Sequence, residues 1–317
     1  MFKSLTVYQL TQATSAVLDR LDNALLSAPF TPCREKEAKS HGFIKPLGED
    51  SEVITYEANG GVLLCLRTDK KLISSSQVKR QVEALRRETE AKNQPFSKTD
   101  ERMAKEEFTD AQLPGANIDT REFFGYFDRE LHMLFLGASD DDADEFIKAL
   151  GKAFGATAPV KLIEIEKDPC DHYTDWAKDP DLLGDHFELG HQGALKHPNK
   201  EGGCGNINAT NEDFDSEEFI SLIDAGRQVS SISLEHDLFN FRLTSKLAVK
   251  NIKLSDRVES EGYDEDAEGV TRANKFAAFV QAMRYVMQDL EPLLGGFVAQ
   301  KLLDLHDRQP EKDEAVA

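Results

Sequence analysis

The sequence has few of the residues that crosslink a protein or hold it in a membrane. Its 317 residues include only four cysteines, which are widely separated and contain no Cys-x-x-Cys pair. This spacing argues against a disulfide framework and against a zinc ribbon, because both need cysteines at short intervals. No run of about 18 apolar residues is present, and the first residues lack the apolar segment of a signal peptide. We therefore expect a soluble, cytoplasmic protein with reduced thiols and no membrane contact.

The sequence also lacks the glycine motifs that hold phosphates in nucleotide-binding enzymes. Neither Gly-x-x-x-x-Gly-Lys-Ser/Thr nor a helix-opening Gly-x-Gly-x-x-Gly occurs. Carboxylate pairs such as Asp213 with Asp215 could hold magnesium, but such pairs arise by chance among 58 acidic residues. A metal-dependent hydrolase is thus a minor alternative, and we expect no enzyme activity and no cofactor. Zinc would need ligands from a group whose spacing fits no common site: Cys170, His172, His186, His191, His197 and Cys204.

Bases are outnumbered by acids, 38 to 58, which gives a net charge of -20. Such a surplus disfavours nucleic-acid binding in general, because phosphate contacts depend on Lys and Arg. Residues 67–105 nevertheless hold eleven bases against six acids. They can form a locally basic surface, since exposed charges more than about 10 Å apart are screened at 0.1 M salt. The alternative is an ordinary solvated helix face, with Glu83 and Arg87 as an i,i+4 pair.

Apolar periodicity predicts an α+β fold. Asn59-Gly60 joins two β-rich runs as a hairpin turn, and residues 229–254 read as a three-stranded meander. Phe276 to Leu294 form one apolar stripe at helical spacing, ended near Pro292 and Gly295. Residues 180–215 predict irregular strands and loops, and residues 256–268 an exposed acidic loop. Three adjacent aspartates from Asp140 are expected to open a helix, where carboxylates favour the positive end of its dipole.

A polar helical hairpin is expected within residues 67–115. Ser75 or Ser76 can cap its first helix, Pro95 interrupts it, and Thr99 marks a restart that runs to about Gln112. The apolar stripe of this pair is narrow, as is typical of helices that bridge lobes in solvent or present a surface to a partner.

Several short segments occur in a recognisable order and at recognisable intervals. They are residues 5–10, 30–33, 58–60, 65–67, 71–73, 173–176, 216–218, 225–229, 247–254 and 294–296. In this order and at these intervals, over roughly residues 3 to 298, they resemble the RdgC family of bacterial, recombination-associated DNA-binding proteins.

The resemblance implies a horseshoe-shaped α+β subunit with antiparallel sheets and a helical hairpin, which pairs with a second copy into a ring-shaped homodimer. It implies one multi-lobed domain over residues 1–303, followed by a polar tail at 304–317. The ring would encircle duplex DNA without sequence preference, associate with the nucleoid and restrain RecA-type recombination. An acidic protein that mimics DNA and occupies a basic partner's nucleic-acid site is the alternative.

Candidate DNA contacts lie in the basic segment. Some fall where the family tends to carry bases, whereas Arg86, Arg87 and Arg102 follow from charge alone. This chain has Gly115 and Asn117 where the family carries an Arg and a Phe, so a ring-closing contact there is expected to be weak or differently made. The full candidate set is Lys70, Lys71, Lys79, Arg80, Arg86, Arg87, Lys98, Arg102 and Lys105.

Overall fold

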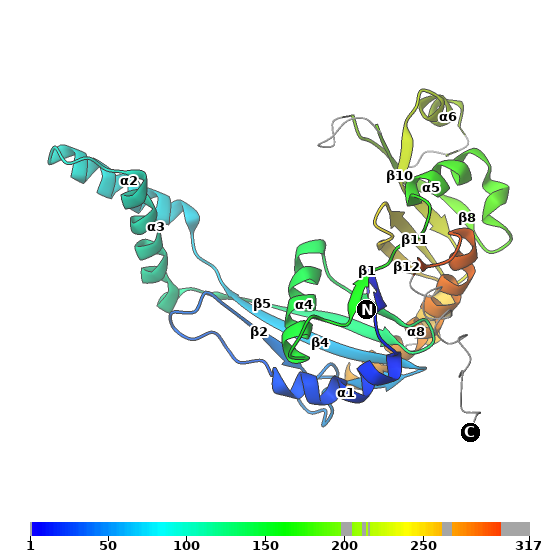
Figure 1. The fold of residues 1–317 in the computed structure, drawn as a ribbon, viewed down its shortest axis with the longest axis horizontal. Helices are drawn as coiled ribbons and strands as arrows, with labels where there is room; N and C mark the ends of the chain where they lie inside the picture. The colour runs from blue at the N-terminus through cyan, green and yellow to red at the C-terminus, as the bar shows by residue number, and fades with distance from the viewer. Residues whose placement is uncertain (1, 198–204, 211–213, 215, 262–267, 299–317) are drawn as a thin grey trace, which may run out of the picture.

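The computed structural model describes residues 2–197, 205–210, 214, 216–261 and 268–298. Within them the chain is an α+β protein with eight α-helices and an open sheet of twelve strands, in which neighbouring strands run antiparallel. The molecule is elongated and curved, with helices α2 and α3 projecting at one end and the lobe around α5 and α6 at the other (Figure 1). No helix in this part of the chain is long and apolar enough to cross a membrane.

One strand connects the two halves of the sheet. Residues Thr6 to Gln9 of β1 pair with β6, while Ser4 and Leu5 pair with β12. The first half has the order β2-β4-β5-β6-β1, with β3 paired to β4 and β7 to β1. Its strands are β1 (Ser4–Leu10), β2 (Lys39–Ile44), β3 (Tyr56–Ala58), β4 (Gly61–Lys71), β5 (Ile118–Asp128), β6 (Met133–Leu136) and β7 (Val160–Leu162).

The second half continues as β12-β11-β10-β8-β9, and its first three strands confirm the predicted meander. The expectation of irregular strands and loops over 180–215 is confirmed for β8, a nine-residue strand whose pairing with β10 contains two register shifts. The glycines of this strand make it hard to recognise in the sequence, because glycine is not typical of strands. At Gly193 a side chain does not fit, since a Cβ there would lie 2.6 Å from the Phe214 ring. The strands are β8 (Glu188–Lys196), β9 (Ile207–Thr210), β10 (Gln228–Glu235), β11 (Phe239–Thr244) and β12 (Val249–Leu254).

Helices cover both faces of the first half. Helices α1 (Thr14–Ser27) and α4 (Asp140–Ala153) share a core cluster with Phe127 of β5. The neighbouring Tyr126, which points to the other face, packs with α8 (Glu268–Leu293). The predicted stripe on α8 is confirmed as core, and the helix ends just before Gly295, whose φ is +75°. The three aspartates do open α4, as predicted.

Three shorter helices complete the second half: α5 (Pro169–Lys178), α6 (Glu217–Asp224) and α7 (Asp256–Glu261). Two 3-10 turns occur, η1 (Leu113–Gly115) and η2 (Pro180–Leu183). The prediction of an acidic loop over residues 256–268 is wrong for residues 256–261, which form α7. Residues 262–267 and the tail at 304–317 lie outside the described residues. Sequence reasoning missed α5, although Asp168 before Pro169 is a helix-start signal, and the Asp168 carboxylate accepts a hydrogen bond from Cys170 N at 2.8 Å.

The predicted helical hairpin consists of α2 (Ser75–Ala91) and α3 (Lys98–Gln112). It is inserted between β4 and β5, which pair along their whole length from Gly61 opposite Asp128 to Lys71 opposite Ile118. The hairpin therefore projects from the end of the part of the sheet formed by β2, β4 and β5 (Figure 1). The caps lie one residue or two before those expected: Ser74 accepts from Gln77 N, and Ser97 forms a capping box with Asp100.

Candidate nucleic-acid interface

The hairpin of α2 and α3 has its own small core. Val78, Val82 and Ala104 are its buried residues, and they form a cluster separate from the two that fill the body. A pair of helices with so little apolar contact leaves most of each helix in solvent. This is where most of the candidate DNA contacts lie.

Basic side chains on α3 gather on one side. At 100° per residue, Lys98, Arg102 and Lys105 fall within a sector of about 60°, which we call the basic face of α3. This face points about 120° away from the buried Ala104, toward solvent.

Acids on α3 lie mainly on its other side. Asp100 and Glu107 fall opposite the basic face, Asp110 lies about 110° from its centre, and Glu101 and Glu106 flank it. The helix thus separates its charges in part, with acids at both edges of the basic face.

On α2 the bases are less separated from acids. Lys79 with Arg86, and Arg80 with Arg87, are seven residues apart and so share two neighbouring faces. Arg86 is bonded to Glu90 at 3.0 Å, and this hydrogen bond raises the pKa of the already charged guanidinium. Exposed pairs of this kind add little stability, so the cation can exchange its partner for a phosphate.

The hairpin as a whole has no net charge, although the excess of bases in residues 67–105 predicted a basic segment. Because α3 runs to Gln112, the folded element also contains Glu106, Glu107 and Asp110. Residues 75–112 hold eight bases and eight acids. Binding of a polyanion must therefore depend on where the bases lie on the hairpin, because the hairpin has no net positive charge.

Lys71 is not available to a phosphate. Its side chain is buried, and its Nζ donates to the carbonyls of Arg34 at 2.7 Å and Glu35 at 2.5 Å. These bonds tie the loop before β2 to the end of β4. We therefore omit Lys71 from the proposed contacts, on the ground of burial.

Lys70, one residue earlier, is exposed in a groove at the base of the hairpin. Strand register places Lys39 of β2 and Asp119 of β5 beside it. The groove has a volume of about 160 Å³, and its other charged residues are Arg121, Asp142 and Glu145. Three bases face three acids, and two of the bases, Lys39 and Arg121, are already in ion pairs. Sequence reasoning missed Lys39 and Arg121, because only the strand pairing reveals them as neighbours of Lys70.

Those zinc candidates that lie within the described residues do not come together as a group. Within the described part of the chain, one set of three metal-ligand side chains lies within 4.8 Å, and it joins His186 to His236 and Asp289. In it, Leu238 N donates to Nδ1 of His236, so Nε2 carries the proton and faces Asp289 Oδ2 at 3.2 Å. That arrangement is a hydrogen bond, and a metal at Nε2 would have to displace the proton. Cys204, Asp213 and Asp215 lie outside the described residues.

Cys170 is poorly suited to act as a nucleophile. Its side chain is completely buried. Burial raises the pKa of its thiol, although Lys196 partly opposes the shift. A nucleophilic cysteine needs a lowered pKa and access to substrate.

These features define a class of protein: an open antiparallel sheet in two halves joined by the first strand, with a charge-separated helical hairpin inserted between its two longest strands. The chain belongs to the RdgC family, whose sequence profile matches residues 1–297 and carries the description "Putative exonuclease, RdgC". It is 25% identical to the Recombination-associated protein RdgC of Yersinia enterocolitica over 300 residues, which cover 93% of this chain and 98% of the relative. The proteins of the same name from Salmonella paratyphi B and Salmonella typhimurium are 26% identical over the same shares.

Proposed function

We propose that this chain binds duplex DNA without sequence preference, as a homodimeric ring, and thereby restrains RecA-type recombination at the nucleoid. The observation that carries the proposal is the basic face of α3 on a hairpin that projects from the body. Non-specific binding needs only Lys and Arg that follow the phosphates, with no reader of base edges. Relatives over nearly the whole chain are named recombination-associated proteins, which supports the cellular role.

The proposed contacts are the six bases of α2 and α3 for which no ion pair occurs within the described residues. If all six engage phosphates, the slope of log K against log salt is about -5 per hairpin, at roughly -0.9 per contact. Lys70 adds a further contact at the hairpin base, and Arg86 contributes where it leaves Glu90. The six are Lys79, Arg80, Arg87, Lys98, Arg102 and Lys105.

The test is a fluorescence-anisotropy titration of a labelled duplex between 50 and 200 mM KCl. The variant Lys98→Glu with Lys105→Glu should weaken binding about ten-fold or more at the lower salt and flatten the slope by roughly two. Its matched control is Arg20→Glu with Lys45→Glu, which makes the same charge change on α1 and after β2, far from the hairpin along the sheet. Equal losses in both variants would refute the role of α3. Absence of binding by the wild-type protein would favour the acidic DNA mimic.

Two further readouts test the remaining parts of the proposal. Sedimentation should give a dimer, and a monomer that ignores DNA would refute the ring. Incubating the duplex with the protein and Mg²⁺ should leave the strands at full length, because we propose binding without hydrolysis. Shortened strands would instead support the exonuclease description of the family.

A further inference from the structure

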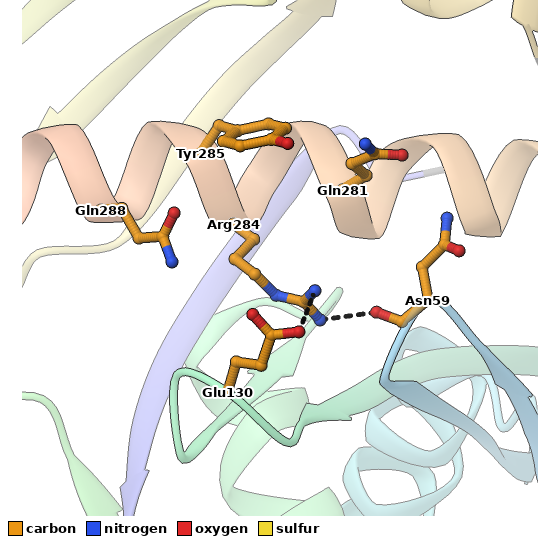
Figure 2. Close-up of a pocket in the computed structure, with 6 residues that line it drawn as sticks. All are labelled: Asn59, Glu130, Gln281, Arg284, Tyr285 and Gln288. Carbon is orange, nitrogen blue, oxygen red and sulfur yellow. Dashed lines mark hydrogen bonds and ion pairs between the residues drawn. The ribbon is translucent and has the colours of Figure 1, made fainter.

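A polar pocket of about 400 Å³ lies between α8 and two turns of the first half of the sheet. It is lined by Asn59 of the β3–β4 turn, by Glu130 of the β5–β6 turn, and by side chains from successive turns of α8 (Figure 2). We call it the α8 pocket. The α8 side chains are Gln281, Arg284, Tyr285 and Gln288.

The back of the pocket is held rigidly by Arg284. Its guanidinium donates to Glu130 Oε1 at 2.8 Å and to the Asn59 carbonyl at 2.6 Å (Figure 2). It also donates to Asp128 Oδ2 at 2.9 Å. Asn59 in turn donates its amide to the Ala277 carbonyl at 2.9 Å. The pocket is therefore formed in advance, which lowers the entropic cost of binding a ligand.

The hydrogen-bond inventory leaves acceptors free for a ligand that donates. Arg284 and the Asn59 amide nitrogen are the donors already in use, whereas the second oxygen of Glu130 and the side-chain oxygen of Asn59 have no partner within the described residues. The amides of Gln281 and Gln288 and the hydroxyl of Tyr285 likewise make no hydrogen bond there, and each of these groups can donate or accept. The Glu130 carboxylate is the free group that can only accept, so a donating ligand satisfies it best.

Charge selects a cation. Glu130 lines the pocket and the buried Asp128 stands behind it, against the single charge of Arg284. Tyr285 also lines the pocket and is 52% exposed, and an accessible aromatic face is a favourable stacking surface for a planar guanidinium. No cation is free in this lining to meet a phosphate, which disfavours a nucleotide.

We propose that the α8 pocket binds an arginine side chain on a basic segment of a partner protein. The guanidinium donates to the free oxygen of Glu130 and stacks on Tyr285, and the amide oxygen nearest to it serves as a further acceptor. The inference is independent of DNA binding by the hairpin, because it uses another element, a different ligand and the opposite charge.

The test follows side-chain amide resonances of the ¹⁵N-labelled full chain by NMR. The probes are N-acetyl-arginine amide, its lysine counterpart, and a duplex DNA. The amide resonances of Asn59, Gln281 and Gln288 should shift with arginine, and several-fold more lysine should be needed for the same shift. Tyr285→Ala should weaken arginine binding about five-fold, whereas Tyr285→Phe should retain it.

Two matched carboxylate variants separate a site from general attraction to an acidic protein. Glu130→Gln should weaken arginine binding, and Glu106→Gln, the same change on α3, should leave it unchanged. Equal effects of the two variants would overturn the proposal, as would equal responses to arginine and lysine. Shifts of the pocket resonances by duplex DNA would assign the pocket to nucleic acid, and loss of the dimer in Tyr285→Ala would assign it to a subunit interface. Either result would also overturn the proposal.

Discussion

Removing Arg284 should destabilise the whole chain, because it leaves a buried carboxylate without its cation. Asp128 is fully buried, and Arg284 is 12% exposed. The guanidinium reaches Asp128 from Nε at 3.2 Å and from Nη2 at 2.9 Å. Breaking a buried pair by removing one partner typically costs about 3 to 5 kcal/mol. Two backbone donors remain in Arg284→Met, from Glu130 N and Leu131 N, each at 2.9 Å from Asp128 Oδ1. We therefore expect the lower end, about 3 kcal/mol.

The assay is urea unfolding followed by far-UV circular dichroism at pH 7. Asp128→Asn combined with Arg284→Met should recover part of the loss, because the unpaired charge is gone. Glu130→Gln is the matched control: its carboxylate is 60% exposed, so its contact with Arg284 should contribute less than about 1 kcal/mol. A loss below about 1 kcal/mol in Arg284→Met, or no coupling in the double variant, would show that the pair does not join α8 to the sheet as argued.

Two more outcomes follow from local geometry. Gly42→Ala should cost about 3 kcal/mol or more in the same urea assay, since its Cβ would lie 2.3 Å from the Phe30 Cα, a backbone atom. Gly115→Ala, whose Cβ meets nothing within 4 Å, should be nearly neutral, and equal costs would contradict the packing argument. Hydrogen bonds from Ser97 lower the pKa of Asp100, so Ser97→Ala should raise it in a ¹³C NMR titration. The stabilisation from the capping box is therefore complete above the unfolded pKa of Asp100 and is lost as the pH falls through its lower folded pKa. The start of α3 should then fray in acid. An unchanged pKa of Asp100 in Ser97→Ala would contradict the role of Ser97.

Elements with regular periodicity were predictable, and elements held by distant partners were not. The meander and the stripe of α8 follow from repeats of two and of three to four residues, and both are confirmed. Strand β2, with the sequence Lys-Ser-His-Gly-Phe-Ile, has little apolar alternation and is fixed by its pairing with β4. No local pattern in the sequence predicts such a strand.

Burial of polar side chains is the second feature that could not be predicted from the sequence. Lys71 stands one residue beyond an exposed lysine in a basic run, and its sequence context favours solvent. In the fold, carbonyls 36 and 37 residues earlier satisfy its ammonium group. Asp69 is buried in a similar way, with hydrogen bonds from Arg67 at 3.1 Å and from Thr120 at 2.8 Å. Tertiary partners of this kind decide which charges reach the surface, and one sequence does not reveal them.

Partial separation of charge across α3 reconciles a neutral hairpin and an acidic chain with the DNA binding that we propose. An α-helix with its side chains is about 10 to 12 Å wide, and the Debye length at 0.1 M salt is about 10 Å. A phosphate on the basic face therefore lies close to Lys98, Arg102 and Lys105 and also meets the flanking Glu101 and Glu106, while Asp100 and Glu107 act from about one screening length away. The acids of the body are farther still, because strands β2, β4 and β5 carry the hairpin outward. The geometry of a single helix, and not the sum of charges, thus decides whether this chain can bind a polyanion.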